Sequence, residues 1–216
     1  MEKLTLLNLF ESIIDEFGVD HDNYPNFDLE TFKSLTSYSK RIQYCNKTLR
    51  RIASGSSRVV YQVDAGNVLK LAKNSQGLNQ NRNEANEYGV SHFENVRTNV
   101  IDRDDDGDLW IISEMAKKIT PFMFKEYTGV AFNIFSEYVI YRYYRNRKIR
   151  SHYLEYTSPE IVDFLNNNEF VEEVVTFMFN NNLAAGDITR ISSWGVVNRN
   201  GTEQVVLTDY GFTGSY

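Results

Sequence analysis

The sequence predicts an α+β protein of two lobes, in which a small antiparallel sheet with one inserted helix precedes a mainly helical half. Short apolar runs between turn signals occupy residues 50–73, and the turn at residues 64–67 joins two of them as a hairpin. From Pro121 onward, apolar and aromatic residues recur at three- and four-residue spacing, which is the period of a helix. The dipeptide Asn200-Gly201 then separates two short apolar runs, as is typical of a tight hairpin.

The chain divides into three regions where these patterns change. We expect a helical N-terminal extension at residues 1–47, a first lobe at residues 48–116 and a reduced second lobe at residues 117–216. The expected elements, in chain order, are helices at 4–17 and 27–45, strands at 59–63 and 68–72, a polar helix at 76–93, a hairpin of 96–101 with 109–113, helices at 124–148 and 161–180, and strands at 195–197 and 204–207.

Composition excludes several classes of protein. The 216 residues are 42% hydrophobic, which is too apolar for a disordered chain. The formal net charge of −6 disfavours general nucleic-acid binding, because phosphate binding needs a cationic surface. Cys45 is the single cysteine, so no intrachain disulfide is expected, and with only three histidines beside it a zinc cage is not expected either. No run approaches the roughly 20 apolar residues of a membrane span, and the first 20 residues lack the pattern of a signal peptide. We therefore expect a cytoplasmic protein with no membrane partner.

A loop of small residues lies between two expected strands. Its members Gly55, Ser56 and Ser57 are candidate phosphate-binding residues, because a loop with few Cβ atoms lets backbone N–H groups approach a polyphosphate. The loop has only one glycine, and an ordinary hairpin turn explains it equally well.

Lys70 lies on the next expected strand, on the same face as Val68, because side chains alternate with period two. A lysine on the buried face of a strand is costly unless it is paired. The alternative is a solvated lysine, which is what we expect of Lys73 on the opposite face. The following helix offers two acidic partners for Lys70. They are Glu84, which is favoured, and Glu87 one turn later.

Two aspartates follow elements of the second half. Asp187 comes after the long helix, and Asp209 comes after the last strand. Such a pair suits a metal–nucleotide site, in which one carboxylate holds Mg²⁺ and the other accepts a hydroxyl proton. Each aspartate alone is weak evidence for such a site. The order of glycine loop, strand lysine, helix glutamate and two aspartates is much stronger evidence.

In this order the residues resemble the protein-kinase-like family over residues 48–216. Residues 54–60 resemble a degenerate glycine-rich loop, with Ala53 and Arg58 where the family often has its first and third glycines. The remaining matches are Val68-Leu69-Lys70 to the ATP-lysine strand, Glu84 to its helix partner, residues 110–116 to the strand that leads into the hinge with Ser113 as gatekeeper, Gly186-Asp187 to the end of the catalytic loop, and Asp209-Tyr210-Gly211 to the DFG motif with Tyr for Phe.

The resemblance implies ATP and Mg²⁺ as ligands and a role for each matched residue. Most of the catalysis would come from positioning and charge neutralisation. The implied roles are phosphate contact by Gly55, Ser56, Ser57 and Lys70, orientation of Lys70 by Glu84, adenine contact by the backbone of Glu114 to Ala116, positioning or deprotonation of the acceptor hydroxyl by Asp187, and Mg²⁺ binding by Asp209.

The sequence departs from the family pattern in two places. The asparagine expected five residues after Asp187 is missing; Ser192 has that spacing, and Ser193 has it if the loop is one residue longer, so both are candidate metal ligands. The sequence also ends five residues after Gly211, without an activation segment, an APE motif or a large helical C-lobe. It therefore resembles a minimal form of the sort that phages encode, for which the host cytoplasm is the expected compartment.

These observations favour a kinase-like nucleotide-binding protein that acts as an ATP- and Mg²⁺-dependent phosphotransferase on a protein or small-molecule acceptor. The alternative is a catalytically inactive pseudokinase that serves as a protein-interaction module or inhibitor. An antibiotic-type small-molecule phosphotransferase ranks third, because the helices that bind its substrate have no counterpart here.

Two further motifs have competing explanations. Residues 102–108 match the first half of a calcium loop, but Ser113 stands at the twelfth position, where a bidentate carboxylate is required, so a solvated hairpin turn is favoured. Residues 141–150 interleave aromatic residues with five basic ones. They form either a surface for nucleic acid or an acidic partner, or a helix with a buried tyrosine face and a solvated arginine face, and the second is favoured.

Overall fold

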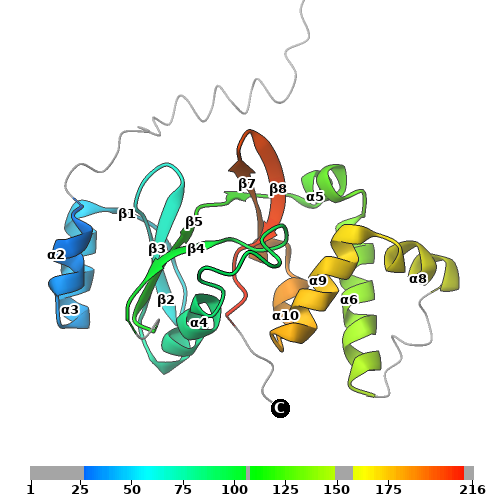
Figure 1. The fold of residues 1–216 in the computed structure, drawn as a ribbon, viewed down its shortest axis with the longest axis horizontal. Coiled ribbons are helices and arrows are strands. Elements are labelled where there is room, and N and C mark those ends of the chain that lie inside the picture. Colours follow the sequence, from blue (N-terminus) through cyan, green and yellow to red (C-terminus); the bar gives the residue numbers. More distant parts are fainter. Residues whose placement is uncertain (1–26, 106–107, 149–157, 212–216) are drawn as a thin grey trace, which may run out of the picture.

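The computed structural model describes residues 27–105, 108–148 and 158–211 (Figure 1). The helix expected at residues 4–17 lies outside the described residues, as does the end of the basic stretch at residues 149–150. The two-lobed α+β architecture is confirmed, with an antiparallel sheet in the first half and mostly helices in the second. The region boundaries at residues 47 and 116 stay predictions.

The first lobe is built on a five-stranded antiparallel sheet in the order β1-β2-β3-β5-β4. The hairpin expected at residues 64–67 is present, since β2 and β3 pair across it. The second hairpin is also present, although its first strand starts later than expected. The strands are β1 Arg50–Ser54, β2 Arg58–Gln62, β3 Asn67–Ala72, β4 Val100–Arg103 and β5 Trp110–Glu114.

Helices cover both faces of this sheet (Figure 1). Helices α2 (Leu29–Ser34) and α3 (Tyr38–Thr48) replace the single helix expected at residues 27–45, and they pack on one face around an apolar cluster that includes the fully buried Phe32. Helix α4 (Ser75–Ala85) packs on the other face, against β3 and β5. The face toward α4 carries Lys70, so the sheet presents this lysine to a helix and not to solvent.

Helix α4 is shorter than the helix expected at residues 76–93. It begins after Asn74, whose side chain accepts a hydrogen bond from the Gly77 N–H at 3.1 Å. Beyond its end, Gly89 and Phe93 have φ angles of 73° and 65°, in the left-handed region. A helix cannot continue through such residues, and the polar residues of this segment carry no periodic apolar signal that would have shown the break.

The second lobe contains six helical segments and a small three-stranded sheet within the described residues. Both long helices expected here are divided. Gly129, with φ of 74°, ends α5 within the helix expected at residues 124–148. The Asn168 side chain caps the start of α9 within the helix expected at residues 161–180. The segments are α5 Pro121–Thr128, α6 Phe132–Asn146, α8 Pro159–Asn166, α9 Glu169–Asn180, α10 Ala185–Ile188, the 3-10 helix η1 Ile191–Ser193, and strands β6 Lys117–Lys118, β7 Trp194–Arg199 and β8 Thr202–Leu207.

An aromatic cluster holds the second lobe together. Trp194 packs edge-on against Phe124 and Phe135, with ring centroids 5.5 Å apart in each case, and Phe170 completes the group. The Trp194 indole N–H also donates to the Ile188 carbonyl at 2.7 Å. Because Ile188 ends α10, this bond fixes the short helix that carries Asp187.

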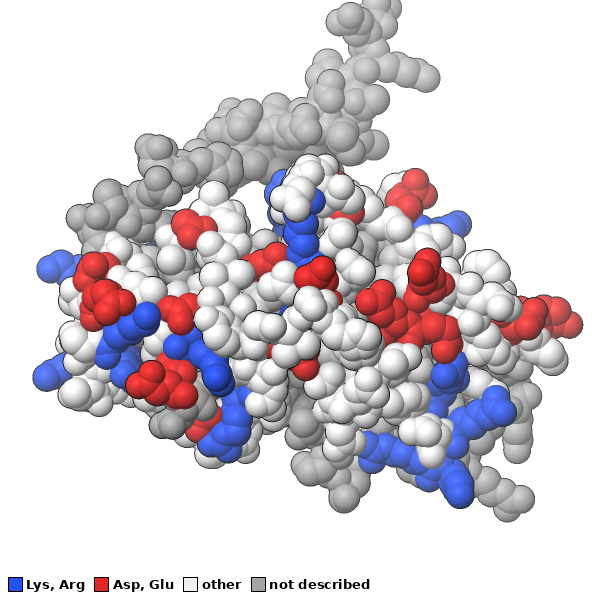
Figure 2. All heavy atoms as spheres, viewed as in Figure 1, with Lys and Arg blue, Asp and Glu red and all other residues white. Residues whose placement is uncertain are grey.

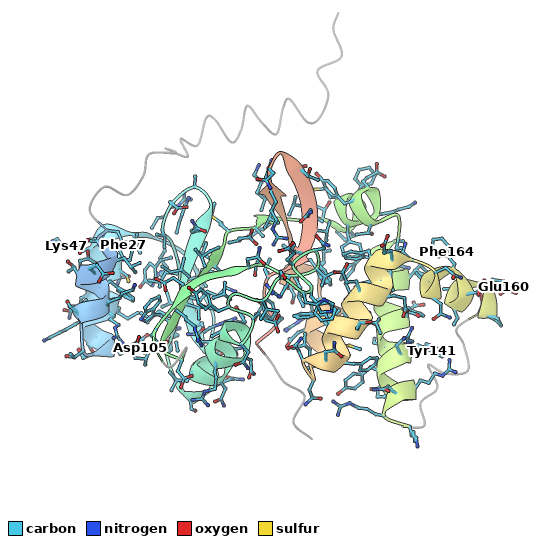
Figure 3. The ribbon with its side chains drawn as sticks, viewed as in Figure 1. Phe27, Lys47, Asp105, Tyr141, Glu160 and Phe164 are labelled. Atoms are coloured by element: carbon cyan, nitrogen blue, oxygen red, sulfur yellow. The ribbon has the colours of Figure 1, made fainter. Side chains whose placement is uncertain are left out.

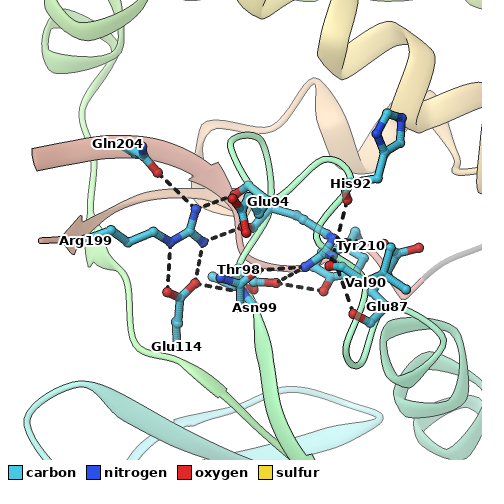
Figure 4. A network of polar contacts seen from close by, with 11 residues as sticks. Glu87, Val90, His92, Glu94, Thr98, Asn99, Glu114, Arg199, Gln204 and Tyr210 are labelled. Atoms are coloured by element: carbon cyan, nitrogen blue, oxygen red, sulfur yellow. Dashed lines mark hydrogen bonds and ion pairs between the residues drawn. The ribbon is translucent and has the colours of Figure 1, made fainter.

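The two lobes are joined by paired backbone and by a polar network (Figure 4). The segment at Arg97 forms a parallel bridge with Leu207 at the end of β8. Arg97 is fully buried and its Nε lies 2.9 Å from Glu87 Oε2. Arg199 on β7 donates to Glu114 Oε1 at 2.9 Å and to the Arg97 carbonyl at 2.9 Å. These contacts hold the end of β8 at a fixed place beside the first lobe.

The side chains at the two ends of the molecule are shown in Figure 3. Phe27 and Lys47 lie at the end formed by α2 and α3, and Phe164, which is 56% exposed, lies on α8 at the other end. Among the described residues, no helix combines the length and the apolar character needed to cross a bilayer.

Candidate functional site

Lys70 is the centre of a buried polar cluster between the two lobes. Its residue is 6% exposed, and its Nζ donates to Glu84 Oε2 at 2.6 Å and to the Thr208 carbonyl at 2.7 Å. Glu84 on α4 is fully buried. The favoured partner of Lys70 is therefore the one present in the structure, since Glu87 pairs with Arg97 instead. One lysine thus ties together β3, α4 and the segment that follows β8.

Arg58 is the second cation of this cluster. It opens β2 and lies 7% exposed on the same sheet face as Lys70. Its Nη1 lies 2.7 Å from Glu84 Oε1, and its Nη2 donates to Asp209 Oδ1 at 2.7 Å. The Nη1–Glu84 contact is an ion pair, and the same nitrogen also donates to Asn81 Oδ1 at 3.2 Å. We call Arg58, Lys70, Glu84 and Asp209 the charge cluster.

The charge cluster was only partly foreseen from the sequence. Three of its members were candidate site residues, but Arg58 was assigned to a glycine position of the loop. The signal that identifies it is the period of the strand: residues 58 and 60 share a face of β2, and Val60 stands opposite Lys70 in the register. The hairpin register therefore places the Arg58 side chain beside Lys70.

The cations of the charge cluster keep Glu84 ionised. Burial by itself raises the pKa of a carboxyl group, but the Arg58 guanidinium and the Lys70 ammonium outweigh it and hold the pKa of Glu84 below its ordinary value of 4.5. The cluster contains two cations and two carboxylates, so its formal charges cancel. Such an arrangement can remain buried because each charge has an opposite charge at contact distance.

The small-residue loop before Arg58 is attached to α4. The Ser57 hydroxyl donates to Gln80 Oε1 at 2.6 Å, and the Lys73 ammonium donates to the Gly55 carbonyl at 2.6 Å. A Cβ atom at Gly77 would lie 2.1 Å from the Ser57 carbonyl oxygen, so only glycine allows this approach. Lys73 was expected to be solvated; it is exposed but also serves this loop. Among the candidate phosphate residues, Gly55 and Ser56 are exposed and Ser57 is buried.

The residues after β8 are attached to the same helix. The Asn83 amide donates to the Gly211 carbonyl at 2.7 Å, and a Cβ atom at Gly211 would lie 2.6 Å from the Gln80 carbonyl oxygen. The Tyr210 hydroxyl donates to the Thr98 carbonyl at 2.9 Å. Between these anchors the Asp209 side chain remains 45% exposed, so it is the most accessible member of the charge cluster.

Asp187 lies on α10. Its side chain is 11% exposed and pairs with Arg190 one turn later. Burial raises the pKa of Asp187, the Arg190 guanidinium opposes this, and the Asp209 carboxylate adds to it. The Asp209 carboxylate thus acts on Asp187 as a like charge. A carboxylate with a raised pKa in such a position can accept a proton from a hydroxyl group.

Two of the candidate metal ligands are serines. Ser192 and Ser193 belong to η1; Ser192 is exposed and Ser193 is 3% exposed. The Ser193 carbonyl accepts a hydrogen bond from the Thr208 N–H at 2.7 Å, which places this serine beside the residue that precedes Asp209. Whether either serine binds a metal stays a prediction.

As arranged, the site does not fit a Mg²⁺ ion. Mg²⁺ binds through one or two carboxylates together with substrate phosphates. Asp209 already accepts a hydrogen bond from the Arg58 guanidinium, and a cation beside the same carboxylate repels a second one. Within the part of the chain that the structure describes, no three His, Cys, Asp or Glu side chains gather around one point.

The expected adenine-facing backbone is largely engaged in protein contacts. The Glu114 N–H donates to the Asn99 carbonyl at 3.0 Å, and the Met115 N–H donates to the Gly66 carbonyl at 2.7 Å. Ala116, the other candidate, packs its Cβ against Gly195, where a Cβ atom would lie 2.7 Å away. Any adenine contact along this segment therefore falls on Ala116 or on carbonyl oxygens.

Ser113, the expected gatekeeper, is fully buried, and among the described residues its hydroxyl has no hydrogen-bond partner.

The basic stretch after residue 140 forms a surface at the C-terminal end of α6 (Figure 2). Arg145 stacks over the Tyr141 ring at 5.8 Å and Arg147 over the Tyr143 ring at 4.6 Å. Tyr143 is buried, as the favoured amphipathic helix requires. Cations at a helix C-terminus also interact favourably with the helix dipole, so no partner is needed to explain them.

Comparison with known proteins finds similarity only to solved structures. No protein-family model matches the chain, and no curated protein matches it. An APH(2")-III structure with GDP and kanamycin shares 11% identity and a TM-score of 0.37, with 76% of this chain and 67% of that chain covered. SAICAR synthase from Saccharomyces cerevisiae shares 13% identity and a TM-score of 0.36, with 75% of this chain and 73% of that chain covered. A streptomycin–ATP–APH(2")-IIa complex shares 12% identity and a TM-score of 0.35, with 82% of this chain and 71% of that chain covered. Sequence identities and TM-scores this low do not indicate a function.

Proposed function

We propose that the protein binds ATP between its lobes, with the phosphates lying against Lys70 and the loop at residues 54–57. Its function is that of a kinase-like protein in which the Lys70–Glu84 pair and Asp209 form the phosphate-binding end of the site. The acceptor is a protein or small molecule. A cytoplasmic location and a phage source stay predictions from the sequence.

One observation carries this proposal: a lysine and a glutamate, both buried, pair at 2.6 Å next to the backbone that leads to Asp209. A buried ion pair is weak support for stability, because replacing it with apolar side chains is often neutral or favourable. A site that must bring a fixed positive charge to an anionic ligand does need such a pair. The exposed small-residue loop on one side and the half-exposed Asp209 on the other border the buried charge cluster.

Phosphoryl transfer is the first candidate activity. Asp187 supports it, since burial and the like charge of Asp209 raise its pKa, as a residue that accepts a proton from an acceptor hydroxyl requires. The proposed steps are binding of the nucleotide phosphates by Lys70, orientation of Lys70 by Glu84, and removal of the hydroxyl proton by Asp187. The family resemblance implies Mg²⁺ for charge neutralisation at the phosphates, but the Arg58–Asp209 pair does not fit it, so these steps use only side chains of the protein.

The second candidate is nucleotide binding without transfer, as in a pseudokinase. A specific observation favours it: Arg58 occupies the carboxylate that phosphotransferases of this class use for the metal. In this case the nucleotide stabilises the fold, and the protein acts through a partner.

Calorimetric titration tests the nucleotide site. We expect ATP to bind the wild type with a micromolar dissociation constant, about 8 kcal/mol, and to bind Lys70→Met at least tenfold more weakly. Methionine fills the volume of the lysine stem, and Glu84 keeps Arg58 as a partner, so the variant should fold. Lys125→Ala on exposed α5 is the matched control. Equal binding by wild type and Lys70→Met contradicts the proposal.

Transfer of labelled phosphate from ATP separates the two candidate activities. If transfer occurs, Asp187→Asn should remove it while ATP binding is retained. If the wild type binds ATP and transfers no phosphate to protein or small-molecule acceptors, the pseudokinase candidate is favoured.

A further inference from the structure

Arg58 is held in the charge cluster from both sides. Its own strand starts at the loop that Ser57 and Lys73 attach to α4 and β3. Its partner Asp209 lies on the segment that Asn83 attaches to the same helix. The contact between the Arg58 guanidinium and the Asp209 carboxylate at 2.7 Å is therefore set by the fold, and is not a chance pairing of two flexible surface side chains.

The Arg58 guanidinium has more N–H donors than its contacts in the structure use. Arginine carries five N–H groups, and the contacts in the structure direct its two terminal nitrogens to Asn81, Glu84 and Asp209. In the proposed complex the remaining N–H groups are the donors to a phosphate, for which a guanidinium is geometrically suited because it can donate two parallel hydrogen bonds. Arg58 is 7% exposed, and the Asp209 side chain beside it is 45% exposed, so the pair borders the open side of the cluster.

A fixed guanidinium at this place performs two tasks that a divalent cation performs in a metal-dependent site. It neutralises Asp209, and it places a second positive charge near Lys70, with which it shares Glu84. It also removes the reason for a metal to bind, since a divalent ion at Asp209 would lie next to a buried positive charge. The carboxylate is not available to both cations at once without moving the arginine away.

We propose that Arg58 replaces the divalent cation in this site, so that the protein binds metal-free ATP. The inference rests on the proposed function and deepens it, because it names the form of the nucleotide that the site accepts. Mg²⁺ should neither be required for binding nor improve it substantially, since the Mg²⁺–ATP complex brings a cation to a place that Arg58 already occupies.

Titration of ATP in the presence of EDTA and, separately, of excess Mg²⁺ tests the inference. For the wild type we expect dissociation constants that agree within about threefold in the two buffers. For Arg58→Gln, which frees Asp209 and removes the charge, we expect at least tenfold weaker binding in EDTA and a recovery with Mg²⁺. Arg51→Gln on the exposed strand β1 is the charge-matched control and should behave as the wild type.

The outcomes separate this inference from the proposed function. Wild-type binding that requires Mg²⁺ overturns the role of Arg58 and leaves ATP binding intact. Absence of ATP binding to the folded wild type in both buffers overturns the proposed function and the inference with it. If Arg58→Gln does not fold, Arg58→Met removes the charge and keeps an apolar stem, and unchanged metal-free affinity in that variant also overturns the inference.

A second readout requires no nucleotide. In a titration followed by the electron paramagnetic resonance of Mn²⁺, the wild type should show no tight Mn²⁺ site that depends on Asp209. Arg58→Gln should gain one, and Asp209→Asn in that background should remove it. A Mn²⁺ site in the wild type that Asp209→Asn abolishes contradicts the inference.

Discussion

Replacement of Glu84 by glutamine tests whether the charge cluster is buried and pre-formed. Glu84 is fully buried, with the Lys70 ammonium at 2.6 Å from one carboxylate oxygen and the Arg58 guanidinium at 2.7 Å from the other. Glutamine has nearly the same shape but no charge, so Glu84→Gln leaves two buried cations with Asp209 as the only carboxylate of the cluster. Removing one partner from a buried ion pair typically costs about 3–5 kcal/mol.

We expect the lower end of that range, about 3 kcal/mol, because the glutamine oxygen can still accept the Lys70 hydrogen bond and Lys70 keeps the Thr208 carbonyl. The assay is urea denaturation followed by tryptophan fluorescence, since Trp110 and Trp194 are both buried. The matched control is Glu126→Gln on the exposed side of α5, which should change the free energy of unfolding by less than about 0.5 kcal/mol.

The double variant Lys70→Met with Glu84→Gln separates pairing from packing. The cost of the double change should be smaller than the sum of the two single changes, because the second substitution removes the charge that the first left unpaired. A loss below about 1 kcal/mol for Glu84→Gln, or strict additivity of the two changes, would refute the reasoning, since either result means that water already solvates these side chains.

Further predictions concern the glycine contact, the second carboxylate and the lobe junction. Gly77→Ala should lower the free energy of unfolding by about 1–3 kcal/mol, because its Cβ atom would lie 2.1 Å from the Ser57 carbonyl oxygen, whereas Gly186→Ala has no atom within 4 Å and should cause no loss in the same urea assay. The pKa of Asp187 is raised above its ordinary 3.8, so its contribution to stability is present below pH 3.8 and is lost as the pH rises through the folded pKa. Unfolding measured at several pH values should therefore show Asp187→Asn gaining relative to the wild type as the pH increases; an unchanged difference contradicts the raised pKa. Arg97→Met should lower stability by about 3 kcal/mol or more, because it leaves Glu87 without its buried partner, and a loss under about 1 kcal/mol would show that the junction is solvated.

Local pattern was sufficient for much of the fold. The hairpins at residues 64–67 and 200–201 were predicted from turn residues alone, and Asn200 and Gly201 have φ angles of 54° and 83°, as a tight hairpin of this kind requires. The Lys70–Glu84 pair could also be predicted from the sequence. Strand alternation placed Lys70 on the same face as Val68, and the following helix offered Glu84 as the favoured acidic partner.

The remaining features depend on contacts between distant residues. The ends of α4 and the division of the later helices are set by single capping residues such as Gly129 and Asn168, which a periodicity of apolar residues does not reveal. Arg58 reaches Asp209 across 151 positions of the chain, so its role appears only when the loop and the end of β8 are placed on the same helix. Its sequence context suggested a loop residue, and only the register of β2 with β3 shows that its side chain points inward.

Hydrogen–deuterium exchange of the wild type with and without saturating ATP tests the central claim most directly. We expect ATP to slow exchange in peptides that cover the loop at residues 54–58 and the segment at residues 208–211, because these two segments border the charge cluster. Peptides from α8, at the far end of the second lobe, should be unchanged. Protection confined to other segments, or no protection under conditions where ATP is bound, would contradict a nucleotide site at Lys70.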